Sequence, residues 1–146
     1  FQLAWSDDLK VGESQKLYYF GRHLAAWRDE DGNAHIWDAF CPHLGAHFGV
    51  RAQIEGSTIT CALHGWTFGV DGKCVDIPYS DRVNKKASVR TYPVVERNGQ
   101  VFAWYHPDDL APMWDVPQLA EFDENTEFSQ VFRRQYSLKC HWQEIA

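Results

Sequence analysis

The sequence predicts an all-β fold, an antiparallel sandwich or barrel built from short strands. Three observations support this prediction. The first hundred residues consist of short segments rich in aromatic and β-branched residues, with turn signals between them at near-regular spacing. Apolar residues make up 45% and aromatic residues 15% of the 146 residues, enough for one domain with a substantial core. No segment of this part has the pattern of a long helix.

The strands are predicted as follows, in chain order. Residues 17–40 form an aromatic and apolar run that the turn sequence EDGN interrupts, so a hairpin is expected there. Residues 57–62, STITCA, form a short strand, and the Asp-Gly pair of VDGK forms the next turn. Residues 91–106 hold two strands around Asn98-Gly99, the strongest hairpin signal in the chain.

Composition changes at residues 106–127, where three prolines and seven acidic residues interrupt the strand pattern. Residues 127–140 alternate again and predict a further strand, with HWQEIA after it as the start of a helix. We therefore predict one domain over residues 1–106, a linker over 107–127, and the opening of a second domain over 128–146. The chain starts at Phe1 rather than Met, so we expect it to be part of a longer protein.

Charge and hydropathy exclude several classes of function. The net charge is −6 and the acidic residues are scattered, so nucleic acid is not an expected partner. No window approaches the roughly 18 apolar residues of a membrane span, and no secretory signal is present. We expect a soluble, cytoplasmic protein.

Two short segments carry the chemistry, CPHLGAH at 41–47 and CALHGW at 61–66. A lone Cys or His is most often a core residue, but four ligand-type side chains in two glycine-flanked units favour a metal. Zinc fits four such donors, yet zinc fingers pair Cys with Cys and His with His, whereas each segment here supplies one of each. That arrangement suits two irons, one bound by both cysteines and the other by both histidines.

This double motif closely resembles that of the Rieske [2Fe–2S] family. The resemblance implies a Rieske-type cluster in which Cys41 and Cys61 bind one iron, and His43 and His64 bind the other. Neutral imidazoles in place of two thiolates make the cluster less negative, so an electron enters against less Coulomb repulsion. A [2Fe–2S] cluster would therefore have a higher reduction potential here than with four cysteines.

Other histidines are expected to have ordinary roles. His47 lies in the first segment, but four ligands are already supplied, so it is expected to pack or to form a hydrogen bond. His106 and His141 have no paired spacing, so they are expected at the surface or hydrogen-bonded. Trp66 is expected to form an aromatic wall that keeps water from the cluster.

The remaining cysteines distinguish branches of the family. Respiratory Rieske proteins carry a disulfide between the two loops, and the corresponding positions here are Ala46 and Leu63. Cys74 and Cys140 lie outside the motif, and each is expected to be a free buried thiol. These departures favour the branch that contains Rieske ferredoxins and the non-haem iron oxygenases.

Three segments, GRHLAAWRDEDGNAHIWDAFCPHLGAH, GKCVDIPYS and YSLKCHWQEIA, resemble the α-subunits of Rieske non-haem iron oxygenases, most of all steroid-acting members of the 3-ketosteroid 9α-hydroxylase and cholesterol 7-desaturase type. The resemblance implies that residues 128–146 begin a catalytic, helix-grip-like domain. That domain would hold a mononuclear Fe(II), bound by residues outside this chain, which activates O₂ on a hydrophobic substrate such as a steroid.

The resemblance also implies partners. Electrons would come from a ferredoxin or flavin-dependent reductase fed by NAD(P)H, and the iron that receives them would belong to a neighbouring subunit of a homotrimer. Two alternatives remain open from the residues. One is a stand-alone Rieske-type ferredoxin electron carrier, and the other is a colourless, zinc-stabilised binding module.

Overall fold

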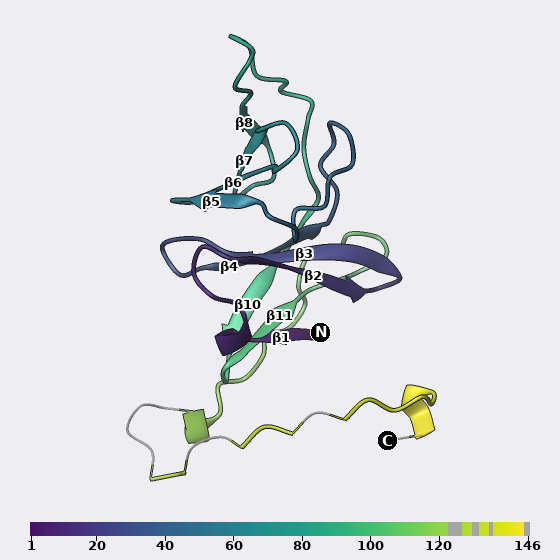
Figure 1. Cartoon of the computed structure of the whole chain (residues 1–146). Coiled ribbons are helices and arrows are strands. Elements are labelled where there is room, and N and C mark those ends of the chain that lie inside the picture. The colour runs from purple at the N-terminus through teal and green to yellow at the C-terminus, as the bar shows by residue number, and fades with distance from the viewer. Residues whose placement is uncertain (123–126, 130–131, 135, 145–146) are drawn as a thin grey trace.

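Three antiparallel sheets are stacked one above another in the computed structural model, which describes residues 1–122, 127–129, 132–134 and 136–144 (Figure 1). As Figure 1 is oriented, the upper sheet has the strand order β5-β6-β7-β8, the middle sheet β2-β3-β4-β9 and the lower sheet β1-β11-β10. The strands are β1 (Gln2–Trp5), β2 (Ser14–Tyr19), β3 (Arg22–Arg28), β4 (Ala34–Asp38), β5 (Gln53–Glu55), β6 (Thr58–Thr60), β7 (Thr67–Gly69), β8 (Cys74–Asp76), β9 (Thr91–Tyr92), β10 (Val94–Arg97) and β11 (Gln100–Ala103). Three single 3-10 turns complete the described elements, η1 (Ser6–Asp8), η2 (Ala120–Phe122) and η3 (Trp142–Glu144). The all-β prediction is confirmed.

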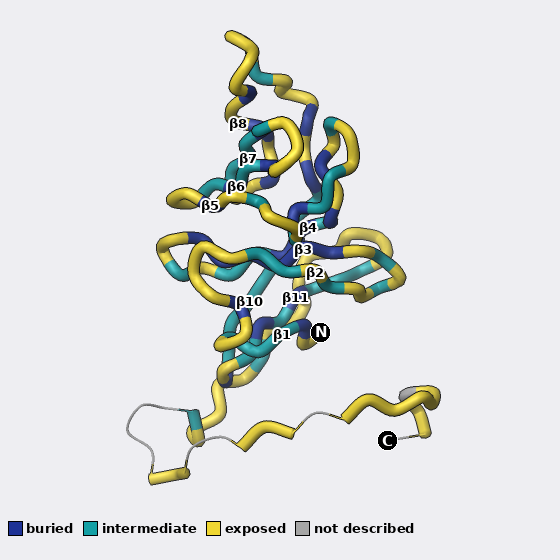
Figure 2. The backbone as a smooth tube through the Cα atoms, in the orientation of Figure 1, coloured by how far each residue is buried: buried dark blue, intermediate teal, exposed yellow. Residues whose placement is uncertain are grey.

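The middle sheet is buried on both faces, because β3 divides its side chains between two cores (Figure 2). Ala25 and Trp27 face the upper core, while Leu24 and Ala26 face the lower core, as the two-residue period of a strand requires. The upper core includes Trp27, Trp37, Phe48, Ile59 and Phe68. The lower core includes Leu3, Leu24, Ile36, Tyr92 and Val101. The middle sheet therefore packs against the upper sheet on one face and against the lower sheet on the other.

The expected hairpin over residues 17–40 is in fact a three-stranded meander. The EDGN turn joins β3 to β4 as predicted, but a second turn at Phe20-Gly21 joins β2 to β3. Both turn residues are left-handed, with φ of 57° and 68°. Sequence rules reserve such turns for Asn, Asp and Gly, so phenylalanine gave no signal. Here the Phe20 ring stacks on Tyr105, 4.4 Å between centroids and 6° between planes, which compensates for the unfavourable backbone.

The Asn98-Gly99 hairpin is confirmed, and its asparagine has a further role. Both residues are left-handed, and β10 pairs with β11 across them. The Asn98 side chain donates to the Pro117 carbonyl at 3.0 Å and accepts from the Leu119 amide at 2.9 Å. The turn that closes the lower sheet therefore also fastens the predicted linker to it.

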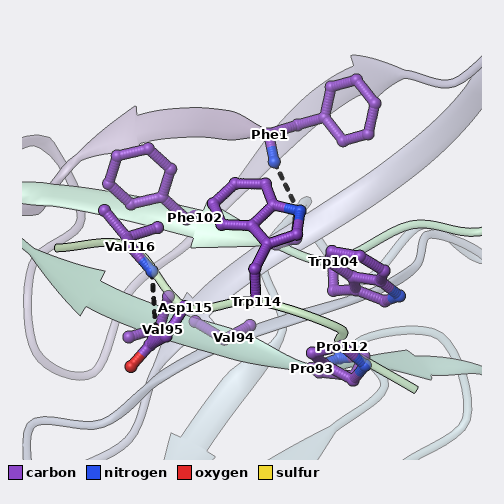
Figure 3. A pocket seen from close by; sticks show the side chains of 11 residues that line it. Phe1, Pro93, Val94, Val95, Phe102, Trp104, Pro112, Trp114, Asp115 and Val116 are labelled. Carbon is purple, nitrogen blue, oxygen red and sulfur yellow. Dashed lines mark hydrogen bonds between the residues drawn. The ribbon is translucent and has the colours of Figure 1, made fainter.

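The linker places one aromatic residue, Trp114, against the lower sheet. Figure 3 shows Trp114 between Phe102 and Trp104, over a small apolar cavity of about 110 Å³ that lies between the linker and Phe1, β10 and β11. Trp104 and Trp114 meet edge to face, with 6.0 Å between ring centroids. This cavity lies on the sheet farthest from the upper sheet (Figure 1).

The tail differs from its prediction in two respects. Within residues 127–140 the described positions form no strand, because none of them pairs with a neighbouring strand. The residues after them do begin a helical turn, the 3-10 turn η3. Cys140 was expected to be buried and is exposed, as are residues 136–139 before it. Among the described elements, no helix has the length and apolar character needed to cross a membrane.

Gly72 provides a test of how the upper sheet is fixed to the chain that follows it. Its φ is +77°, and an added Cβ would lie 2.2 Å from the Val89 carbonyl oxygen. Gly12 has a similar φ of +74° but open space around it. We expect Gly12→Ala to cost about 1–2 kcal/mol of unfolding free energy from the left-handed backbone alone. Gly72→Ala should cost about 1–3 kcal/mol more, because the backbone must move.

Urea denaturation followed by tryptophan fluorescence measures both values. Equal losses in the two variants would show that the contact between Gly72 and Val89 is not tight.

Candidate metal centre

Two loops between strands place the four predicted ligands together. The first, residues 41–46, follows β4, and the second, residues 61–66, joins β6 to β7. In the first loop the Cys41 amide donates to the Ala46 carbonyl at 2.8 Å, and the Gly45 amide donates to the Cys41 carbonyl at 2.9 Å. The second loop repeats the same two bonds at 2.8 and 3.0 Å. The repeated motif of the sequence is therefore a repeated turn in the structure.

A glycine is required in each loop at the same place. Gly45 and Gly65 have φ of +76° and +72°, the left-handed region that side chains rarely adopt. Gly65 is constrained further, since an added Cβ would lie 2.9 Å from the ring of Pro78. Each glycine lies four residues after its cysteine and lets the turn close there.

The two motif cysteines lie together in the interior. Cys41 and Cys61 are only 3% and 4% exposed, and both belong to the upper core. Burial raises the pKa of the Cys41 thiol to about 11, and the neighbouring Cys61 adds to the rise. The amides of His43 and Leu44 oppose it by donating toward the Cys41 sulfur. Two adjoining buried thiols of this kind are a site that a cation would convert to thiolates.

The two motif histidines lie outside the cysteines. The His43 and His64 rings are 4.7 Å apart between centroids at an interplanar angle of 72°. His64 is exposed and His43 is half-buried. The sulfur donors thus lie together in the interior and the nitrogen donors together at the surface. This segregation fits a group with two metals and two donors for each, better than a single tetrahedral ion.

One face of His43 is covered by Trp66. The indole is 9% exposed and stacks on the imidazole at 4.4 Å and 6°. Its Nε1 donates to the Tyr79 hydroxyl at 2.5 Å. The expected shielding role for Trp66 agrees with this geometry. Sequence reasoning missed Tyr79, because thirteen residues separate it from Trp66 and no spacing rule connects them.

The other histidines have the local roles expected of them. His47 accepts a hydrogen bond from the Gly49 amide at 2.9 Å, and burial lowers its pKa. His106 accepts from the Asp108 amide at 3.1 Å, and His141 accepts from the Gln143 amide at 3.3 Å. His47 directly follows the first loop, but none of these three hydrogen bonds involves a predicted ligand.

Cys74, as expected, is a free buried thiol outside the pair of loops. Its pKa is raised by burial. Among the described residues, no group of three or more His, Cys, Asp or Glu side chains is arranged to hold a single metal ion.

Known proteins resemble the chain along most of its length. Cholesterol 7-desaturase nvd of Xenopus laevis is 40% identical over 138 residues, 94% of this chain and 30% of that protein. The oxygenase component of 3-ketosteroid-9-alpha-monooxygenase of Rhodococcus rhodochrous is 34% identical over 131 residues, 87% of this chain and 34% of that protein. This chain therefore spans about a third of the length of these relatives.

A solved structure agrees in fold. The reduced complex between oxygenase and ferredoxin in carbazole 1,9a-dioxygenase contains a chain that matches with a TM-score of 0.62 and 32% identity, over 70% of this chain and 27% of that one. The Rieske [2Fe–2S] domain family matches residues 1–93, which include both loops. The chain belongs to the Rieske [2Fe–2S] family.

Proposed function

We propose that this chain is the electron-transfer part of a Rieske non-haem iron oxygenase, with Cys41 and Cys61 as ligands of one iron and His43 and His64 as ligands of the other. The observation that carries the proposal is the segregation of donors, with two buried thiols in one core and two adjoining imidazoles at the surface. The 1–93 family match supports the cofactor, a Rieske [2Fe–2S] cluster.

When bound, the cluster supplies reversible one-electron transfer. The residues of the chain make this possible in three ways. The core around Cys41 and Cys61 keeps water from the sulfur side, and the two amides directed at Cys41 stabilise negative charge there. His43 and His64 bring the opposite side to the surface, where an exposed imidazole N–H can donate to a carboxylate of a partner. The surface side is therefore the path by which an electron enters and leaves.

The whole protein is proposed to use this electron at a mononuclear iron in the part of the sequence that this chain does not span. The chain covers 30% of the cholesterol 7-desaturase and 34% of the 3-ketosteroid monooxygenase component, which leaves room for a catalytic domain. These names support a steroid as the class of hydrophobic substrate and O₂ as the oxidant. We retain residues 1–106, 107–127 and 128–146 as domain, linker and opening of that catalytic domain.

Partners follow from the same reasoning. The ferredoxin complex of the carbazole 1,9a-dioxygenase oxygenase supports a ferredoxin, or a flavin-dependent reductase, as electron donor. The acceptor is proposed to be the mononuclear iron of a neighbouring subunit in a homotrimer, reached through the surface imidazoles. Cys74 and Cys140, the two cysteines outside the proposed ligand set, form no disulfide in the described part of the chain, which is typical of a reducing compartment and supports a cytoplasmic location.

The test is the ratio of iron to acid-labile sulfide in protein expressed from the intact gene. We expect three irons to two sulfides, since the oxygenase would hold the cluster and one further iron. A ratio of two to two would instead identify a stand-alone electron carrier. A protein with zinc and no sulfide would overturn both readings of the site.

A further inference from the structure

A third segment, residues 77–80, braces the loop of the second cysteine and histidine. Ile77 is buried in the upper core, and the Ser80 amide donates to the Ile77 carbonyl at 3.0 Å, which closes a turn. Between them, Pro78 lies against Gly65, and the Tyr79 hydroxyl accepts from Trp66. Consecutive residues of this turn therefore contact consecutive residues of the loop.

The described contact that fixes the Tyr79 side chain is a hydrogen bond at its hydroxyl, since most of the residue is exposed. It is 63% exposed, so its ring contributes little to the core. Its described hydrogen bond is the one from the Trp66 Nε1 at 2.5 Å. The indole that makes this bond lies parallel to the His43 ring, 4.4 Å away. Two successive contacts thus connect an exposed tyrosine, through Trp66, to a proposed iron ligand.

We propose that Tyr79 is a positioning residue for electron transfer, which holds Trp66 parallel to His43 and so keeps water from one face of that imidazole. The inference rests on the proposed function, because it takes His43 as a ligand of the cluster. It assigns a role to a residue that the Cys/His motif does not contain.

The physical reason gives the direction of the effect. Reduction adds one negative charge to the cluster and its ligands, and water stabilises the more highly charged form. An indole fixed over His43 excludes water there, so it disfavours the reduced form and lowers the reduction potential. Without the hydrogen bond to Tyr79, core packing alone holds the indole, and it departs from its parallel position more often. Water then reaches His43, and the potential rises.

The experiment is Tyr79→Phe in the cluster-containing protein, with the midpoint potential measured by optical redox titration. We expect full iron and sulfide content and a potential raised by up to about 59 mV, which corresponds to a tenfold change in the one-electron reduction equilibrium. Tyr18→Phe is the matched control, because Tyr18 is also 63% exposed but lies on β2 against His23. The control should keep the wild-type potential.

Trp66→Phe provides a second, independent test, because it keeps an aromatic ring beside His43 but removes the N–H donor. If Tyr79 acts through Trp66, the variant that combines Tyr79→Phe with Trp66→Phe shifts the potential no further than Trp66→Phe alone. Additive shifts would overturn the proposal, as would an unchanged potential in Tyr79→Phe or an equal shift in Tyr18→Phe. Should the Tyr79→Phe protein fail to hold a cluster, Trp66→Phe alone becomes the test. A wild-type potential in Trp66→Phe would then overturn the proposal. A wild-type protein without sulfide would instead contradict the proposed function itself.

Discussion

Replacing Cys61 with alanine is expected to abolish the cluster while leaving the β fold intact. Cys61 supplies one of two proposed thiolates of one iron, and Cys74, the remaining cysteine of the same core, lies outside the two loops. Loss of a direct ligand should exceed the roughly 10–100-fold weakening that follows loss of a residue behind a ligand. Acid-labile sulfide per chain should fall from two to near zero, together with the visible absorbance.

Cys140→Ser is the matched control for this prediction. Cys140 is also a free thiol, but it is exposed and lies outside the two loops. It should retain full iron and sulfide. Far-ultraviolet circular dichroism of the purified proteins then separates loss of the cluster from loss of the fold. Full sulfide in a folded Cys61→Ala protein would remove Cys61 from the ligand set.

The second large effect is expected from His64→Cys. A thiolate in place of a neutral imidazole adds one negative charge directly to the iron, so the electron must enter against greater repulsion. Rieske centres have potentials of about −150 to +300 mV and plant-type ferredoxins, with four cysteines, about −400 mV. We expect the midpoint potential to fall by on the order of 100 mV or more, with the visible and electron paramagnetic resonance spectra shifted toward those of a four-cysteine cluster.

His64 suits this experiment because it is exposed, so a smaller side chain leaves no buried cavity behind. His106→Cys serves as control, since it introduces the same chemical change at a histidine outside the two loops. An assembled cluster with the wild-type potential in His64→Cys would show that His64 is not a ligand. Loss of sulfide with retained fold would still place His64 at the iron, as a ligand that cysteine does not replace.

The cluster motifs, the Asn98-Gly99 hairpin and the all-β class could be predicted because each depends on residues close together in the sequence. The Cys-x-His and Cys-x-x-His units lie within short turns, and the hydrogen bonds that shape each turn join residues four or five positions apart. Asn98-Gly99 likewise specifies its own backbone conformation. The all-β class follows from strand-forming residues at short spacing. In each case the residues that cause the structure are neighbours in the chain, so the pattern is visible along it.

Contacts between distant residues account for what the sequence did not show. The Phe20-Gly21 turn depends on Tyr105, which supplies a stacking partner that no local rule includes. Arg28 at the end of β3 donates to both carboxylate oxygens of Glu96, each at 2.9 Å, across 68 positions of sequence. The tail residues 127–140 have the alternation of a strand, yet their described positions lack the neighbouring strand that would complete one.

The site shows the same division. The identity of the four proposed ligands is a property of two short motifs, and the sequence alone was sufficient to name them. The inward direction of the cysteines, the surface position of the histidines and the bracing of Trp66 by Tyr79 depend on how the upper sheet packs on the middle sheet. Ligand type is set by covalent chemistry within a few residues. Solvent access, which distinguishes the buried sulfur side from the exposed nitrogen side, is set by packing among segments that meet only in the folded chain.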